Sequence, residues 1–240
     1  MSELLIAEKE NVLEVTFNRP DKGNALTPEM VEAIRTALDA LSPDIRAVVI
    51  RANGEDFCTG RAPSMPAPGS RVTALDLRKA VSDPVLDFYQ RLRDVPVPLI
   101  AVVQGRAAGV GCAIAALADL AIAAETASFQ IPEMNHDIAP TLVLNALADR
   151  LPRAALARMV LSRDVIPAAE AKTIGLIGMT AAPDHLASEC DRLVGQLRSN
   201  SPAPLRAVKS FLAIGLQSSP ASRNELAALL NCVATAERYR

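Results

Sequence analysis

Three short runs of aliphatic residues, at 47–51, 99–103 and 120–124, constrain the fold of this chain more than any other feature. Continuous apolar runs of this length are typical of strands that are buried on both faces of a parallel sheet. Helical patterns lie at 28–41 and 74–94, and a small-residue helix is expected to follow the turn at 105–111 and to end near Asp119. This alternation predicts βαβ crossovers, and therefore an α/β core with a largely parallel sheet covered by helices.

The two ends of the chain differ from this central pattern. Short strands at 4–7 and 12–17 flank Glu10-Asn11, which predicts a hairpin, and Thr27-Pro28-Glu29 favours a helix start at residue 28. We expect a core domain over residues 1–180 and a helical region over residues 181–240. Beyond residue 142 the pattern predicts one strand, 176–180, and the helices 142–150, 153–162, 167–174, 184–199, 203–216 and 220–238. The last helix has an apolar stripe that suits packing on its own core or on a neighbouring subunit, formed by Leu226, Leu229, Leu230 and Val233.

Charge and composition argue against several classes of partner. The 25 Lys and Arg residues against 27 Asp and Glu residues leave a formal charge of -2, so no bulk positive field attracts nucleic acid or anionic lipid. Gln104, Arg106 and Asp119 interrupt the most apolar stretch, 99–124, and the acidic first residues do not resemble a signal peptide, so we expect a cytoplasmic protein that spans no membrane. No metal-ligand spacing occurs, and we expect buried free thiols at Cys58, Cys112, Cys190 and Cys232.

Two glycine-centred turns follow buried strands and are candidates for binding negative charge. One is Cys58-Thr59-Gly60-Arg61, and the other is Ala108-Gly109-Val110-Gly111 at the start of a helix. Backbone amides at a helix start have no partner within the helix, and the helix dipole favours an anion there. Such amides can stabilise a developing oxyanion. Alternatively, the glycines only permit tight turns and close packing.

Other glycine-loop and nucleophile chemistries do not match the sequence. The segment 109–114 lacks the third glycine of a dinucleotide-binding fingerprint, and no phosphate-binding loop ending in GK[ST] occurs. A nucleophilic triad has little support, because the chain has only His136 and His185 and no G-x-S-x-G turn.

Glu133 is a candidate acid/base residue. It follows the strand-like sequence Phe129-Gln130-Ile131-Pro132 and lies between the apolar residues Ile131 and Met134. A carboxyl group in an apolar loop loses solvation, which raises its pKa and suits it to accept and return a proton near neutral pH. A solvated loop carboxylate is the alternative.

Together these motifs resemble the enoyl-CoA hydratase/isomerase (crotonase) superfamily, and the resemblance covers essentially the whole chain. Six segments occur in the order and spacing of that family. They are Asn18-Arg19-Pro20 with Asn24-Ala25-Leu26, Phe57–Gly60, Val103–Cys112, Phe129–Glu133, Ala168–Leu176 and Ser201–Lys209.

The resemblance implies a ββα spiral core, a C-terminal helical region for trimerisation, and trimers that often pair into hexamers. It places the thioester oxygen between the backbone amides of Arg61 and Val110, with Glu133 moving the proton. Coenzyme A enters as part of an acyl-CoA substrate, and no tightly bound cofactor is expected. The resemblance assigns substrate binding, largely through the backbone, to Lys22, Asn24, Ala25, Leu26, Gly60, Ala62 and Gly109.

Departures from the family pattern bear on the reaction. Hydratases of the family use two glutamates, and the first falls at Ala113 here, while the second matches Glu133. Arg61 replaces a usual small residue, and Ala62 replaces a common Asp. The isomerases of the family keep only the later glutamate, so the sequence predicts double-bond isomerisation of an enoyl-CoA by one base. His136 and Asp137 are candidates for a further proton donor or acid.

Alternatives within the same fold are an enoyl-CoA hydratase, a thioester hydrolase, a decarboxylase or a ring-forming enzyme. A different class is an acyl-CoA-binding paralogue of reduced activity, in which Ala113 reflects lost function. The acyl pocket is expected to involve residues 63–95 and the C-terminal helices. Within it, the segment 63–72 is rich in Pro, Gly and Ser, which predicts a mobile or ligand-ordered loop.

Overall fold

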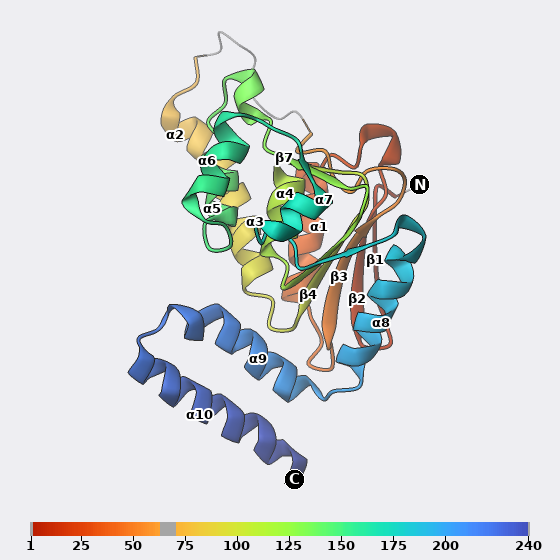
Figure 1. The fold of residues 1–240 in the computed structure, drawn as a ribbon, viewed down its shortest axis with the longest axis vertical. Helices are drawn as coiled ribbons and strands as arrows, with labels where there is room; N and C mark the ends of the chain where they lie inside the picture. Colours follow the sequence, from red (N-terminus) through yellow and green to blue (C-terminus); the bar gives the residue numbers. More distant parts are fainter. Residues whose placement is uncertain (1, 63–70, 240) are drawn as a thin grey trace.

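The computed structural model describes residues 2–62 and 71–239, and a six-stranded sheet forms the centre of the fold (Figure 1). The sheet is parallel except for its first pair, β1 with β2, which confirms the expected parallel core. Its strands, in spatial order, are β1 (Leu4–Lys9), β2 (Val12–Phe17), β3 (Ala47–Ala52), β4 (Leu99–Val103), β6 (Leu120–Ala124) and β9 (Met179–Ala181). The segment 63–72, predicted to be mobile or ligand-ordered, lies mostly outside the described residues.

The predicted hairpin at the start of the chain is confirmed. Glu10 and Asn11 have φ values of 49° and 66°, the left-handed conformation that a two-residue hairpin turn requires at both positions. The antiparallel register follows directly, with Lys9 opposite Val12 and Leu4 opposite Phe17.

Helices pack on both faces of the main sheet. Helix α8 (Leu186–Arg198) packs against β3, β4, β6 and β9, and Figure 1 shows it on the opposite side of the sheet from α1 (Pro28–Asp39) and α4 (Val110–Leu117). The first part of the expected C-terminal helical region therefore covers the sheet. The remaining helices of the core are α2 (Ala74–Leu77), α3 (Asp83–Arg93), α5 (Thr141–Leu147), α6 (Arg153–Leu161) and α7 (Ala168–Thr173).

The helix expected over 74–94 is present as one helical run over residues 74–93, with a change of hydrogen-bond pattern within it. A π-helical turn, η2 (Arg78–Ser82), separates α2 from α3. Pro84 lies in the first turn of α3 and has no N–H to donate to the carbonyl four residues earlier, which accounts for the π-helical turn.

A second, three-stranded sheet was not expected in full. It consists of β5 (Arg106–Ala108), β7 (Ser128–Gln130) and β8 (Ile166–Pro167), of which only β7 had a strand-like sequence. Isolated β-bridges extend it, pairing Cys58 with Ala107 and Leu26 with Arg61. The short one-turn helices of the structure are η1 (Pro20–Lys22), η3 (Glu133–His136), η4 (Pro183–His185), η5 (Gly215–Gln217) and η6 (Glu237–Tyr239).

The chain ends in a helical hairpin that projects from the core, formed by α9 (Pro202–Ile214), η5 and α10 (Pro220–Ala236). We call residues 202–236 the C-terminal hairpin. In the apolar stripe of α10, Leu226 and Leu230 are half-buried, whereas Leu229 and Val233 are 60% and 59% exposed. The stripe is thus only partly covered by this chain.

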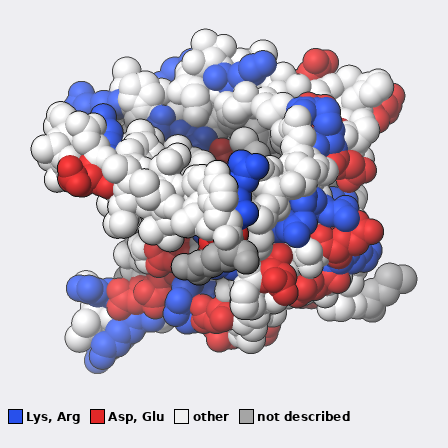
Figure 2. All heavy atoms as spheres, turned by 90° about the horizontal axis from the view of Figure 1, so that it is seen from below, with Lys and Arg blue, Asp and Glu red and all other residues white. Residues whose placement is uncertain are grey.

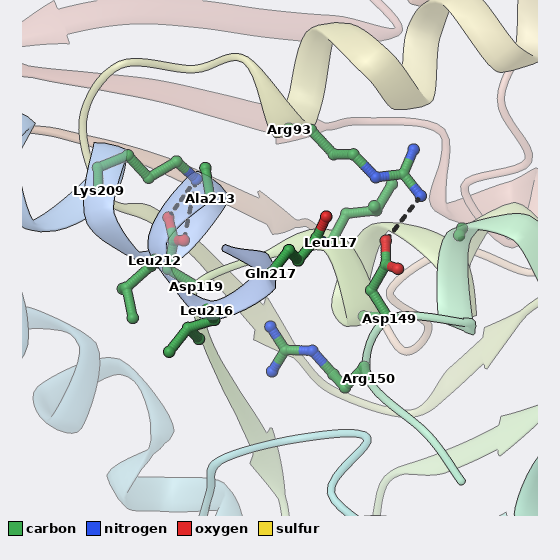
Figure 3. A pocket seen from close by; sticks show the side chains of 12 residues that line it. Arg93, Leu117, Asp119, Asp149, Arg150, Lys209, Leu212, Ala213, Leu216 and Gln217 are labelled. Atoms are coloured by element: carbon green, nitrogen blue, oxygen red, sulfur yellow. Dashed lines mark hydrogen bonds and ion pairs between the residues drawn. The ribbon is translucent and has the colours of Figure 1, made fainter. Parts of the chain in front are cut away.

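A buried ion pair anchors the C-terminal hairpin to the core. Lys209 of α9 donates to both carboxylate oxygens of Asp119, at 2.9 and 2.7 Å, and Asp119 also accepts from the Leu99 amide at the start of β4. The pair borders a cavity of about 660 Å³ between α9 and the core, where the Arg150 guanidinium lies opposite Gln217 (Figure 3).

Acidic and basic side chains are interspersed on the face shown in Figure 2, in keeping with the small net charge. Within residues 2–62 and 71–239, no helix has the length and apolar character needed to cross a membrane.

Replacing Lys209 by Met should destabilise the protein by roughly 3 kcal/mol, because the partly buried Asp119 carboxylate loses its cation. The free energy of unfolding from urea titration measures this. Lys172→Met, at an exposed site in α7, is the matched control and should change it by less than about 0.5 kcal/mol. Equal effects of the two substitutions would contradict the anchoring role.

Candidate active site

The two glycine turns predicted from the sequence are joined by backbone hydrogen bonds. The Phe57 amide donates to Gln104 O at 2.9 Å, Cys58 N donates to Arg106 O at 3.1 Å, and Ala108 N donates to Cys58 O at 2.9 Å. These bonds fix the loop after β3 against the loop after β4. The two turns therefore lie side by side, at the carboxyl ends of neighbouring parallel strands.

Asp56 and Arg106 add a side-chain clamp to this junction that the sequence analysis missed. Asp56 Oδ1 accepts from the Arg106 amide at 3.0 Å and from its Nε at 2.9 Å, and Oδ2 accepts from Nη2 at 2.6 Å. The hydrogen bonds from the Arg106 side chain lower the pKa of the Asp56 carboxyl below its ordinary value. Only the fold reveals this pair, because the residues are 50 positions apart.

The backbone amides of Arg61 and Val110 occupy distinctive positions in these turns. Leu26 bonds to both neighbours of Arg61, its N–H donating to Gly60 O at 2.9 Å and its carbonyl accepting from Ala62 N at 2.8 Å. In such a parallel bridge, the N–H of Arg61 points to the side opposite Leu26. Val110 is the first residue of α4, so its amide has no partner within the helix.

Both turns require glycine for conformational reasons. Gly60 has φ +128° and Gly109 has φ +52°, values that side-chain-bearing residues rarely adopt. A Cβ at Gly60 would meet no atom of the described residues within 4 Å. At Gly111, a Cβ would lie 2.2 Å from Cys58 O, which shows how closely the start of α4 approaches the first turn.

Glu133 lies directly against the second turn. Strand β7 pairs with β5, and the Gly109 amide donates to Gln130 O at 3.0 Å, which places η3 and its first residue, Glu133, beside Gly109. A Cβ at Gly109 would be 2.6 Å from Glu133 Oε1 and 3.9 Å from Gly60 Cα. Glu133 and the two glycine turns are thus brought together, as predicted.

The environment of the Glu133 carboxyl is poorly solvating. Its Oε2 is buried and has no hydrogen-bond partner among the described residues. Burial raises the pKa of Glu133, while its own backbone amide and the His136 side chain lower it by smaller amounts. The result is a carboxyl group that exchanges a proton more readily near neutral pH than an exposed glutamate does.

Other predicted residues take structural or peripheral positions. The buried Asn24 side chain braces three loop segments: it donates to Asn53 O at 2.8 Å and Asp56 O at 2.7 Å, and accepts from Arg19 N at 2.8 Å. Ala113 is fully buried in α4. Lys22, His136 and Asp137 are exposed, Leu26 is buried, and Ala25 and Ala62 are half-buried.

The cavity in Figure 3 is separate from this site. Ala116, Leu117 and Asp119 line it at the C-terminal end of α4, whereas the glycine turns and Glu133 adjoin the N-terminal end.

Comparison with known proteins agrees with the fold. The profile of the family described as Enoyl-CoA hydratase/isomerase matches residues 7–232. The chain belongs to the enoyl-CoA hydratase/isomerase family. This membership makes it an acyl-CoA enzyme, and it confirms the superfamily that the motifs indicated.

Relatives in this family include several hydratases. The 2,3-dehydroadipyl-CoA hydratase of Escherichia coli strain K12 is 31% identical over 246 residues, covering 100% of this chain and 93% of the relative. The (E)-benzylidenesuccinyl-CoA hydratase of Thauera aromatica is 32% identical, over 85% of this chain and 80% of the relative. The crystal structure of an enoyl-CoA hydratase from Mycobacterium smegmatis has a TM-score of 0.89 at 27% identity, covering 97% of this chain and 91% of that one. The predicted crotonase-like α/β fold is therefore confirmed.

Alanine substitutions should separate the glycine that the packing requires, Gly111, from the glycine beside Glu133, Gly109. Gly111→Ala should lower the free energy of unfolding by about 3 kcal/mol, because the carbonyl of Cys58 is held in the backbone and cannot retreat. Gly109→Ala should lower the free energy of unfolding less than Gly111→Ala does. It should nevertheless abolish acyl-CoA turnover, because the new Cβ displaces Glu133 Oε1. Urea titration and turnover assays measure the two effects. Gly195→Ala, in an open helix position, is the control, and a Gly109→Ala variant of unchanged turnover would contradict the site.

Proposed function

We propose that this enzyme isomerises the double bond of an enoyl-CoA, with the amides of Arg61 and Val110 as an oxyanion hole and Glu133 as the base. The observation that carries the proposal is the contact of Glu133 Oε1 with the Gly109 turn, which adjoins Gly60. A thioester oxygen bound between the two amides would place the neighbouring carbon within reach of this carboxylate.

The chemistry follows from where negative charge develops. Glu133 takes a proton from C2 of a 3-enoyl-CoA, and the electron pair of the C–H bond moves toward the thioester oxygen. The resulting dienolate carries its charge on that oxygen, where the two amides donate hydrogen bonds, and the dipole of α4 adds to the stabilisation. Protonation at C4 then completes the shift, so no water is consumed.

The residue at position 113 supports isomerisation over two-carboxylate hydration. Ala113 is fully buried in α4 and supplies no acid. One base suffices to remove a proton from one carbon and return it to another. Coenzyme A enters with the substrate, and the proposal invokes no further cofactor.

Hydration is the second candidate, because the curated relatives described above are named as hydratases. It needs the same oxyanion hole and an acid/base group, and differs in adding water at C3. Thioester hydrolysis and binding without turnover remain as outcomes that the same assays detect.

Proton exchange at C2 of a saturated acyl-CoA tests the oxyanion hole and the base without presuming either reaction. In D₂O, the wild-type enzyme should replace the C2 protons of hexanoyl-CoA, as followed by mass spectrometry. Glu133→Gln should slow this exchange by at least about 100-fold, because the general base is lost. The exchange rate should fall as the pH drops through the Glu133 pKa, which burial raises above its ordinary value.

Turnover then distinguishes the candidate reactions. The enzyme should convert 3-hexenoyl-CoA to the 2-enoyl isomer faster than it hydrates crotonyl-CoA. Faster hydration would replace isomerisation with the second candidate, and free coenzyme A would indicate hydrolysis. Binding without exchange or turnover would leave only the acyl-CoA-binding alternative. Glu55→Gln, at an exposed acid, is the matched control and should change none of these rates.

We also propose that the C-terminal hairpin packs against other copies of this chain, in a trimer or a pair of trimers. Large apolar side chains are exposed along it, whereas such residues generally bury their surface in a protein or an interface. They are Val208, Leu212, Ile214, Leu216, Leu229 and Val233.

Placing charges on this surface should dissociate the assembly. Sedimentation velocity should give wild-type protein three or six times the 25.4 kDa mass of one chain. The double variant Leu229→Glu, Val233→Glu should sediment as a smaller species, whereas Leu161→Glu, at an exposed site in α6, should not. A monomeric, folded wild-type protein would contradict the proposal.

A further inference from the structure

Thr59 joins the first glycine turn to a neighbouring loop, and the proposed mechanism does not yet use it. Its amide and its Oγ1 both donate to Gly23 O, at 2.9 and 3.0 Å. A Cβ at Gly23 would lie 2.6 Å from Thr59 Oγ1 and 2.8 Å from its Cγ2. Both branches of the Thr59 side chain therefore lie directly against Gly23, the residue that follows η1.

Two further hydrogen bonds join the same loop to the rest of the turn. Leu26 N donates to Gly60 O at 2.9 Å, and Ala62 N donates to Leu26 O at 2.8 Å. Thr59, Gly60 and Ala62 are thus all held by residues 23–26, which we call the bracing segment.

The bracing segment sets the direction of the Arg61 amide. In a trans peptide, the carbonyl and the N–H of one peptide group point in opposite directions. The peptide group between Gly60 and Arg61 presents its carbonyl to Leu26 N, so its N–H points away from the bracing segment. A shift of the turn relative to this segment would reorient the N–H that we propose as an oxyanion donor.

Thr59 lies where the turn changes from a fixed to a permissive backbone. On one side, Cys58 is paired with β5 through hydrogen bonds to Arg106 and Ala108. On the other, Gly60 has φ +128°, and no atom of the described residues lies within 4 Å of a Cβ built there. Glycine restricts the backbone least of all residues, whereas β-branched threonine has few side-chain rotamers. The Thr59 side chain is therefore suited to fix the turn just before its most adjustable residue.

We propose that Thr59 is a positioning residue, whose contacts with Gly23 hold the first glycine turn so that the Arg61 amide faces the thioester oxygen. The role requires no contact between Thr59 and the substrate. The inference rests on the proposed function, because it assigns the residue that orients one of the two oxyanion donors.

The effect falls on the reacting state more than on substrate binding. Negative charge on the thioester oxygen develops only as the C2 proton leaves, so a misdirected N–H weakens the transition state more than the bound substrate. Removing one oxyanion donor costs about 100- to 1000-fold in kcat, and a donor that is only misaligned costs less.

Thr59→Val tests the proposal, because it keeps the β-branched shape and removes the hydroxyl. Its kcat for isomerisation of 3-hexenoyl-CoA should fall by about 10-fold, with KM within about twofold of wild type. Exchange of the C2 protons of hexanoyl-CoA in D₂O should slow by a similar factor, since both reactions place charge on the same oxygen. The pH dependence of this exchange should keep its position, because the Glu133 carboxyl is unchanged.

Two matched variants isolate the contribution of the hydroxyl. Thr59→Ser restores the donor and should return both rates to within roughly threefold of wild type. Thr173→Val removes a comparable hydroxyl, which donates to Ala169 O at 2.9 Å in α7, and should change neither rate.

The carbonyl stretching frequency of a bound thioester measures the oxyanion hole without turnover. Hydrogen bonds to the carbonyl oxygen weaken the C=O bond and lower this frequency. Infrared difference spectra with hexanoyl-CoA labelled with ¹³C at the thioester carbon should show a lower frequency on wild-type protein than in water. The frequency should fall less on Thr59→Val. This measurement also serves if Thr59→Val is less stable, since it detects only folded protein with bound ligand.

The outcomes separate this inference from the proposed function. If Thr59→Val keeps the wild-type rates and carbonyl frequency, or changes only KM or the free energy of unfolding, Thr59 is not a positioning residue although the proposed function stands. A moved pH profile would place the effect at Glu133 and would also overturn the inference. If wild-type protein neither lowers the carbonyl frequency nor exchanges the C2 protons, the oxyanion hole fails, and the proposed function and this inference fail with it.

Discussion

Direct backbone pairing between the loop after β3 and the loop after β4 is the constraint on which the candidate site depends. Backbone hydrogen bonds join Phe57 and Cys58 to Gln104, Arg106 and Ala108. They hold the carbonyl oxygen of Cys58 so close to Gly111 that no side chain fits there. The Asp56–Arg106 pair holds the same junction from its exposed side. Because neighbouring parallel strands end at one edge of the sheet, this pairing brings two remote turns, and with them two backbone amides, to one place.

The second sheet extends the same junction to Glu133, the candidate base. Its strand β5 leads into the second glycine turn. Strand β7 runs parallel to β5, and the chain then enters η3. Glu133 is therefore positioned by main-chain hydrogen bonds. In this position one carboxylate oxygen of Glu133, Oε2, is buried and has no hydrogen-bond partner among the described residues. Burial destabilises the ionised form of the Glu133 carboxyl and so raises its pKa. A site that tunes a proton-transfer group in this way loses some stability to gain reactivity.

The parts of the fold that could be predicted from the sequence are those governed by local patterns. The aliphatic runs at 47–51, 99–103 and 120–124 are strands β3, β4 and β6, because a continuous apolar run needs burial on both faces. Prediction was incomplete where a distant partner decided the outcome. Strands β5 and β8 exist only through pairing with remote segments. The Asn24 side chain joins two loops by hydrogen bonds to Asn53 O and Asp56 O, a role that the sequence did not indicate.

By itself, the sequence determined the parallel core, the glycine positions that need a left-handed backbone, and the candidate base Glu133. Backbone conformation and hydrophobic periodicity are properties of short segments, so the amino-acid sequence alone is enough to predict them. Only the tertiary structure decided that Glu133 touches the Gly109 turn and that Asp56 meets Arg106. Those contacts join residues tens of positions apart, and their distances depend on how the sheets and helices pack together.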